Sequence, residues 1–229
     1  MMVIAFDADD TLWQNETLYA RSQDVLRDVL APYASSQQVT EALFATEMRN
    51  LPAFGYGIKS FVLSMIETAV SLSNGRIPAN DIGRILAAAK AMTAADVELL
   101  PHVADTVPVL AATHTLMIIT KGDLLDQERK VARSGLRDYF TYVEVVSQKT
   151  TAVYANLLAR HGLVPAQFVM VGNSLRSDIL PVVEMGGTAV YIPYVNTWAH
   201  ENNIGTAPLN GYHELAHMGE LPDLLNQLL

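Results

Sequence analysis

The sequence predicts an α/β protein built on a doubly wound parallel sheet, with a small all-helical cap domain inserted into it. Three observations support this prediction. Short apolar runs recur along the chain, helical patterns alternate with the last four of them, and one long stretch contains helical patterns only. Alternating strands and helices are typical of parallel sheets covered by helices.

Five apolar runs are the predicted strands. Each is rich in Val, Ile or aromatic residues and shows little polar alternation, which favours parallel strands buried on both faces. The runs occupy residues 2–6, 115–119, 142–146, 168–171 and 188–192.

Helical patterns with Leu, Val and Ala at three- and four-residue intervals separate the last four strands. The first two of these patterns end beside Gly135 and Gly162, and glycine commonly ends a helix. They cover residues 123–134, 150–160 and 177–185.

The stretch from residue 14 to residue 98 contains no predicted strand. It is too long for a simple crossover between two strands, so we expect a helical cap domain of residues 14–98 inserted into a core domain of residues 1–13 and 99–229. Open α/β sheets bind ligands at the carboxyl ends of their strands, where such a cap would lie. The helical patterns cover residues 18–30, 38–50, 58–72 and 81–91.

The composition excludes several classes of function. The 229 residues include 24 acidic and 15 basic side chains and no cysteine. Without clustered Lys and Arg, nucleic-acid binding is not expected, and without cysteine there is no disulfide, thiolate metal site or cysteine nucleophile. No apolar run reaches the roughly 18 residues that span a bilayer, and no signal peptide is evident. We therefore expect a cytoplasmic protein, for which small anionic substrates remain possible, with its oligomeric state open.

Three carboxylates directly follow the first predicted strand. Asp7, Asp9 and Asp10 would repel one another unless a cation or protons lay between them. A solvated turn that starts a helix is the alternative, because Asp favours turns and caps. Such turns seldom follow a buried strand so directly, which favours metal-assisted chemistry.

Polar residues also follow the next three strands. Thr120 ends the second strand, and we interpret the adjacent Lys121 as a solvated loop charge. Lys149 precedes the helix after the third strand, and the N-terminus of that helix suits an anion. Asn173 and Asp178 follow the fourth strand and offer oxygen ligands or hydrogen bonds. All these positions lie at one edge of the predicted sheet and converge on one site.

These residues together resemble the haloacid dehalogenase-like hydrolase superfamily, a large group dominated by phosphatases. Asp7, Asp9 and Thr11 match its first motif, Asp-x-Asp-x-Thr. Thr120 matches the Ser or Thr that closes strand two, and Lys149 matches the lysine before a helix. The resemblance covers nearly the whole chain, including a helical cap inserted after the first motif.

The sequence departs from the family pattern at two positions. The fourth motif, a Gly-Asp pair followed by another acid, is matched incompletely by Gly172, Asn173 and Asp178. Asn173 stands where a carboxylate usually binds the metal, and an amide oxygen is a weaker, neutral ligand for Mg²⁺. Asp10 stands where many relatives carry glycine, which we expect to alter the turn and leave the chemistry unchanged.

The resemblance implies a Mg²⁺-dependent phosphatase for a small phosphorylated metabolite. Asp7 would be the nucleophile that forms an aspartyl-phosphate, and Asp9 the general acid and base. Thr120 and Lys149 would bind the phosphate oxygens. The implied metal ligands are Asp7, the backbone carbonyl of Asp9, Asn173 and Asp178.

Three other functions compete with hydrolysis of a phosphomonoester. A phosphomutase would use the same residues and remains open. A dehalogenase is disfavoured because its chemistry has no use for an acid/base carboxylate at Asp9. The alternative without catalysis is a phosphate- or partner-binding module with a degraded metal site, which Asn173 suggests.

Two further motifs were set aside. His213 to His217 matches the zinc-protease pattern HExxH, but no third histidine follows, so a surface helix near the C-terminus is the favoured reading. Tyr56 lies between glycines in the segment 54–59. We favour a connection between two cap helices there, with contact between Tyr56 and a substrate as the alternative.

Overall fold

The first strand, β1 (Val3–Phe6), lies between two parallel neighbours, β2 (Thr115–Lys121) and β4 (Phe168–Gly172). All four of its residues are buried. A central parallel strand has helices on both faces, which is why its sequence is an unbroken apolar run. The structure is a computed structural model that describes residues 2–202 and 210–228.

The sheet of the described residues has the strand order β3-β2-β1-β4-β5-β6, and every neighbouring pair is parallel. The predicted doubly wound parallel sheet is confirmed. Five strands were predicted, whereas β6 is a sixth, and its two residues are too few to show any periodicity. The remaining strands are β3 (Tyr142–Val146), β5 (Thr188–Tyr191) and β6 (His213–Glu214).

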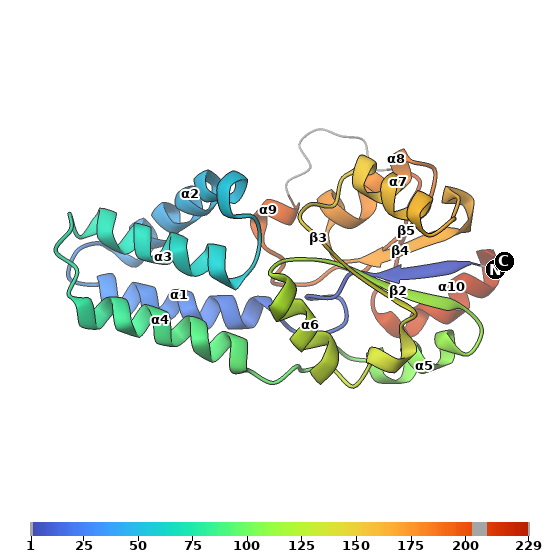
Figure 1. Cartoon of the computed structure of the whole chain (residues 1–229), viewed down its shortest axis with the longest axis horizontal. Coiled ribbons are helices and arrows are strands. Elements are labelled where there is room, and N and C mark those ends of the chain that lie inside the picture. Colours follow the sequence, from blue (N-terminus) through green and yellow to red (C-terminus); the bar gives the residue numbers. More distant parts are fainter. Residues whose placement is uncertain (1, 203–209, 229) are drawn as a thin grey trace. The chain divides into compact units, whose positions relative to one another are not determined.

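Alternate residues of β1 face two separate hydrophobic cores. Ile4 and Phe6 belong to one core, together with residues of α5 (Val103–Ala111) and α10 (Leu221–Leu228). Val3 and Ala5 belong to the other, with residues of α7 (Thr151–Arg160) and α8 (Leu180–Glu184). The two helix pairs cover opposite faces of the sheet (Figure 1), which leaves the carboxyl ends of the strands free for polar side chains.

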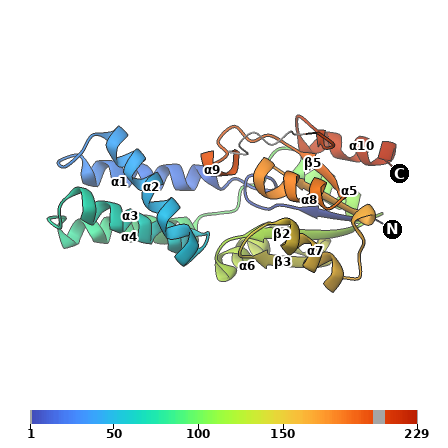
Figure 2. The same ribbon diagram turned by 90° about the horizontal axis from the view of Figure 1, so that it is seen from above.

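The chain divides into two compact units. The α/β unit comprises residues 1–16, 97–121 and 128–229, and the helical unit comprises residues 17–96 and 122–127. The helical unit has its own apolar core, to which Leu26, Leu43, Phe61, Met65 and Ile85 contribute. Figure 2 labels the helices of its first segment, which are α1 (Glu16–Leu30), α2 (Ser36–Phe54), α3 (Ile58–Leu72) and α4 (Ala79–Ala94). The residues between Phe54 and Ile58 connect α2 to α3.

Several shorter elements complete the described part of the chain. Helix α6 (Leu124–Arg133) follows β2, and α9 (Ala199–Asn202) follows β5. Short 3₁₀ or π turns occur at Arg137–Tyr139, Pro165–Gln167, Leu175–Ile179 and Met218–Glu220. No helix among the described residues is long and apolar enough to cross a membrane.

The HExxH segment is not a helix, so the expected surface helix over these residues is wrong. His213 and Glu214 form β6, where Glu214 pairs with Tyr191 of β5. His217 precedes a 3₁₀ turn, and α10 begins only at Leu221. The two histidines therefore do not share a helix face, which a zinc site of this type requires.

Candidate active site

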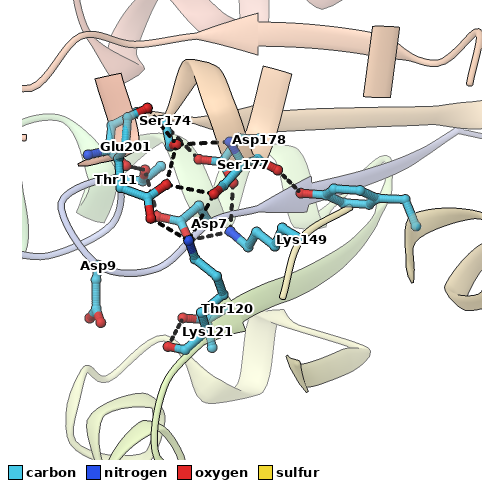
Figure 3. Close-up of polar contacts among 12 residues, drawn as sticks. Asp7, Asp9, Thr11, Thr120, Lys121, Lys149, Ser174, Ser177, Asp178 and Glu201 are labelled. Atoms are coloured by element: carbon cyan, nitrogen blue, oxygen red, sulfur yellow. Dashed lines mark hydrogen bonds and ion pairs between the residues drawn. The ribbon is translucent and has the colours of Figure 1, made fainter. Parts of the chain in front are cut away.

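A buried cluster of Asp7, Lys149 and Asp178, here named the Asp7 cluster, lies at the carboxyl end of the sheet (Figure 3). Lys149 Nζ is 2.5 Å from Asp7 Oδ1 and 2.6 Å from Asp178 Oδ1. The side chains of Lys149 and Asp178 are each 1% exposed. Asp7 extends β1 by one residue, because its backbone N–H donates to the Val171 carbonyl at 2.9 Å. The adjacent strands β1 and β4 thus set the positions of both carboxylates.

The Asp7 cluster holds two carboxylates and one ammonium. Burial raises the pKa of Asp7 to about 7, and the Asp178 charge adds to this effect while Lys149 opposes it. Burial alone would lower the pKa of Lys149, but the Asp178 and Asp7 carboxylates more than offset this and raise it. Lys149 therefore stays charged, and the Asp7 cluster has one more carboxyl group than it has cations.

Asn173 joins the Asp7 cluster through the hydroxyl of Thr11. Thr11 Oγ1 lies 3.2 Å from Asp7 Oδ2 and 3.2 Å from Asn173 Oδ1. A hydroxyl has one proton, so it donates to only one of these two oxygens at a time. On its other side, the Asn173 amide N–H donates to Thr197 Oγ1 at 3.1 Å, which leaves the amide oxygen directed at the Thr11 hydroxyl.

Asp178 is packed tightly against the end of β4. Its Oδ2 accepts a hydrogen bond from the backbone N–H of Ser174 at 3.0 Å. A Cβ atom added to Gly172 would lie 2.2 Å from this oxygen, far inside van der Waals contact. Glycine at position 172 is therefore required for Asp178 to reach Lys149.

Two predicted site residues make no hydrogen bond with the Asp7 cluster among the described contacts. Thr120 is buried at the end of β2, where its hydroxyl lies 3.4 Å from the Lys121 carbonyl. The Asp9 carboxylate is bound by Lys130 and Trp13 and lies apart from the Asp7 cluster (Figure 3).

Asp10 has a structural role that follows from its backbone conformation. Its φ of 60° lies in the left-handed region, which glycine adopts most readily. Its carboxylate accepts hydrogen bonds from the backbone N–H groups of Asn15 and Glu16, at the start of α1. Asp10 thus takes a position suited to glycine and satisfies free N–H groups at a helix N-terminus.

The interpretation of Lys121 as a solvated loop charge is wrong. Its side chain is 12% exposed, and its Nζ lies 2.5 Å from Glu201 Oε1 and 2.8 Å from Ser177 Oγ. Glu201 also accepts from the hydroxyls of Ser174 and Ser177, each at 2.6 Å. Burial opposes ionisation of Glu201, but Lys121 and the two hydroxyls lower its pKa to about 2.

Sequence reasoning missed Lys121 and Glu201 for different reasons. Lys121 has a local signal, because it directly follows Thr120 at a strand end. Glu201 lies 80 residues further on in α9 and has no motif around it. Only the path of the chain after β5 brings it to Lys121.

The residues present suit a hard cation such as Mg²⁺. The Asp7 cluster has two carboxyl groups against one ammonium, and two oxygen acceptors, Asp7 Oδ2 and Asn173 Oδ1, face the same hydroxyl. Oxygen ligands and retained waters are what Mg²⁺ prefers. No group of three or more His, Cys, Asp or Glu side chains among the described residues is arranged to hold a metal. A cation here would therefore depend on Asn173, backbone oxygen and water.

Comparison with known proteins identifies the family. The model of the haloacid dehalogenase-like hydrolases matches residues 1–186. The chain belongs to this family. A haloacid dehalogenase-like hydrolase from Xanthomonas campestris has a solved structure with 39% identity and a TM-score of 0.88, covering 100% of this chain and 91% of that one. The comparison with curated proteins found no match.

Other solved structures with a similar fold have different names. A 2-haloacid dehalogenase from Pseudomonas syringae is 22% identical with a TM-score of 0.67, and 100% of each chain is covered. A predicted phosphoglycolate phosphatase from Haemophilus somnus is 18% identical with a TM-score of 0.67, and 98% of each chain is covered. These likenesses support the fold alone and do not distinguish phosphate from halide chemistry.

Proposed function

We propose that this hydrolase cleaves a small phosphomonoester in two steps through an aspartyl-phosphate on Asp7, with Mg²⁺ as cofactor. The observation that carries the proposal is a pair of carboxylates on one short loop after β1. Asp7 is buried against Lys149, and Asp9 is bound by Lys130 and Trp13. Hydrolysis of a phosphate ester needs both a nucleophile and a separate group that moves protons.

In the first step, Asp7 attacks phosphorus while the bond from phosphorus to the ester oxygen breaks. The leaving oxygen takes a proton from Asp9. In the second step, Asp9 takes a proton from water, whose oxygen attacks phosphorus and releases inorganic phosphate. Asp7 regains its carboxylate and Asp9 its proton, so the cycle closes without any other reactant.

Lys149 and Thr120 are proposed to bind the phosphoryl oxygens, on which negative charge lies in the transition state. The Lys149 ammonium is already held rigidly between Asp7 and Asp178. The Thr120 hydroxyl makes only a long contact with the Lys121 carbonyl among the described residues, so it is available to a ligand.

We propose that Asp7 and Asn173 hold the Mg²⁺. Asp178 and the backbone carbonyl of Asp9 complete the set of residues that the family pattern implies for the metal. When bound, Mg²⁺ would offset the repulsion between the phosphate and the Asp7 carboxylate. Asp178 is proposed to contribute mainly through its charge, because its oxygens already contact Lys149 and the Ser174 N–H.

The helical unit is proposed to be the cap that selects the substrate. In a family where the core residues perform the chemistry, selectivity depends on the contacts of the cap with the leaving group. Tyr56, between α2 and α3, stays a candidate for such a contact.

A haloacid dehalogenase is the rival suggested by the structural relatives. That reaction attacks carbon, expels halide without needing a protonated leaving group, and would leave Asp9 unused. A phosphomutase would use the same residues but would pass the phosphoryl group to a second hydroxyl instead of water.

The decisive experiment measures release of phosphate from a generic aryl phosphate and a panel of phosphorylated metabolites, with and without Mg²⁺. Asp7→Asn removes the nucleophile, while Asp105→Asn makes the same change at an exposed position on α5. We expect Mg²⁺-dependent turnover in the wild type and in Asp105→Asn, and none in Asp7→Asn.

Two results would contradict the proposal. One is that the wild type, tested on varied phosphate esters, shows no more metal-dependent turnover than Asp7→Asn. The other is release of chloride from a 2-chlorocarboxylic acid at a rate above that of Asp7→Asn, without phosphate release from any ester. Transfer of labelled phosphate to an alcohol in preference to water would identify a phosphomutase.

A further inference from the structure

The orientation of Asp9 is set by two side chains outside the Asp7 cluster. Lys130 Nζ lies 3.0 Å from Asp9 Oδ1 and 3.1 Å from Asp9 Oδ2. The indole N–H of Trp13 donates to Asp9 Oδ1 at 2.8 Å. The Asp9 carboxylate consequently has one defined orientation in this structure, turned away from Asp7 (Figure 3).

Lys130 is a buried lysine with little freedom to move. Its side chain is 7% exposed, and its Nζ also donates to Asn15 Oδ1 at 2.8 Å. Because an ammonium group removed from water needs acceptors, these contacts keep Nζ in place. Trp13 is 1% exposed and Asn15 is 8% exposed, so the surroundings of Lys130 are equally well packed.

A purely structural reading is that this ion pair ties α6 to the loop after β1. Any acidic residue on that loop would serve such a purpose. Lys130 instead contacts both oxygens of the carboxylate that the proposed reaction requires as proton donor and acceptor. Trp13 binds one of the same oxygens, which further restricts the rotation of that carboxylate.

We propose that Lys130 is a positioning residue for Asp9, which it orients for proton transfer in both chemical steps. This inference rests on the proposed phosphatase function. Without the Lys130 ammonium, Asp9 loses the partner that contacts both of its carboxylate oxygens, and the carboxylate samples other orientations. Proton delivery to the leaving oxygen and proton removal from water both become slower.

The expected signature is a dependence on the leaving group. An alkoxide must be protonated as it leaves, whereas a nitrophenolate is stable as an anion. Loss of Lys130 should therefore slow the first step on an alkyl phosphate much more than on a nitrophenyl phosphate. The second step, in which water is deprotonated, should be slowed for both substrates.

The test compares Lys130→Met with Lys90→Met, which changes an exposed lysine on α4. We expect Lys130→Met to lower kcat on an alkyl phosphate by about 10- to 100-fold. This is less than the roughly 10²- to 10⁴-fold that proton transfer contributes, because Asp9 itself remains. KM should change little, and the rapid first release of nitrophenol should persist. In an Asp9→Asn background, Lys130→Met should cause no further loss, because it acts through Asp9.

The inference would be overturned if Lys130→Met lowered the rate of the first step equally on both esters. It would also be overturned if Lys130→Met lowered kcat a further tenfold in the Asp9→Asn background. Lys130→Gln keeps a hydrogen-bond donor and gives a second variant if Lys130→Met does not fold. The indole N–H resonance of Trp13 tests the contact without any turnover. It should shift in Lys130→Met and not in Lys90→Met, and an unmoved resonance would also overturn the inference. Failure of the wild type to hydrolyse any phosphate ester would instead contradict the proposed function.

Discussion

The ammonium of Lys149 lies 2.5 Å from Asp7 Oδ1, and only 1% of the Lys149 side chain is exposed. The two residues are 142 positions apart in the sequence, and their contact is buried. The proposed nucleophile is therefore also half of a buried ion pair. Changes at either residue should affect both activity and stability.

Replacing Lys149 by methionine should abolish turnover and destabilise the fold. The change leaves Asp7 and Asp178 buried without a cation, and breaking a buried ion pair on one side costs about 3–5 kcal/mol. Urea denaturation monitored by far-ultraviolet circular dichroism measures this loss. Lys90→Met, at an exposed position, should change the free energy of unfolding by less than about 0.5 kcal/mol. An unchanged stability of Lys149→Met would contradict the ion pair.

The raised pKa of Asp7 predicts a pH dependence of stability in the absence of divalent cations. The pKa is about 7 in the folded protein against 3.8 for the ordinary side chain. Between these values the folded state binds more protons than the unfolded state, so stability falls as pH rises from about 4 to about 7. The comparison is the free energy of unfolding of the wild type and Asp7→Asn at several pH values.

Asp7→Asn should flatten part of this dependence. Asp10 and Glu47, whose pKa values burial raises to about 6 and about 7, should account for a further part in both proteins. If the free energy of unfolding depended on pH identically in the wild type and Asp7→Asn from pH 4 to pH 8, Asp7 would not have the raised pKa.

Replacing Asn173 by aspartate should tighten activation by Mg²⁺. Asn173 Oδ1 shares the Thr11 hydroxyl with Asp7 Oδ2, so a carboxylate there adds charge where a cation is proposed to bind. The measurement is the Mg²⁺ concentration that gives half-maximal activity, which should fall severalfold. Asn80→Asp adds the same charge at an exposed position on α4 and should leave this concentration unchanged. A variant with wild-type metal dependence would show that Asn173 is not a ligand.

Replacing Gly172 by alanine should displace Asp178 and disable the site. The new Cβ would lie 2.2 Å from Asp178 Oδ2, and overpacking of this kind costs about 1–3 kcal/mol. Gly83→Ala, on α4 with open space at its Cβ, should instead stabilise the protein by about 0.5–1 kcal/mol. The two melting temperatures should therefore move in opposite directions. Wild-type kcat in Gly172→Ala would contradict a catalytic role for the Asp178 position.

Much of the fold could be predicted because buried segments are apolar, and apolar runs can be recognised in the sequence. β1 is apolar throughout because helices cover both of its faces, so its position was predicted to within a residue. Parallel strands also place their carboxyl ends at one edge, which is why Asp7, Lys149 and Asp178 could be grouped before any coordinates were known. Strand β6 was not predicted because its two residues, which pair with β5, are too few to show a hydrophobic period.

The partners of the charged side chains could not be predicted. Lys121 was interpreted as a solvated charge, yet it is bound to Glu201 from α9. Lys130 showed no motif, yet it holds both oxygens of Asp9. A lysine has the same sequence pattern whether its ammonium group faces water or a buried carboxylate. Which of these it faces depends on how the loops cross the sheet.

The hydrophobic pattern of the chain predicts the α/β sheet, and the positions of the acidic and basic residues predict that they gather at the carboxyl ends of its strands. Hydrophobic periodicity is local, so it can be recognised without coordinates. The tertiary structure alone decided that Asp7 lies against Lys149 and that Asp9 turns instead to Lys130. These pairings join residues more than a hundred positions apart, and their geometry exists only once the strands are in register.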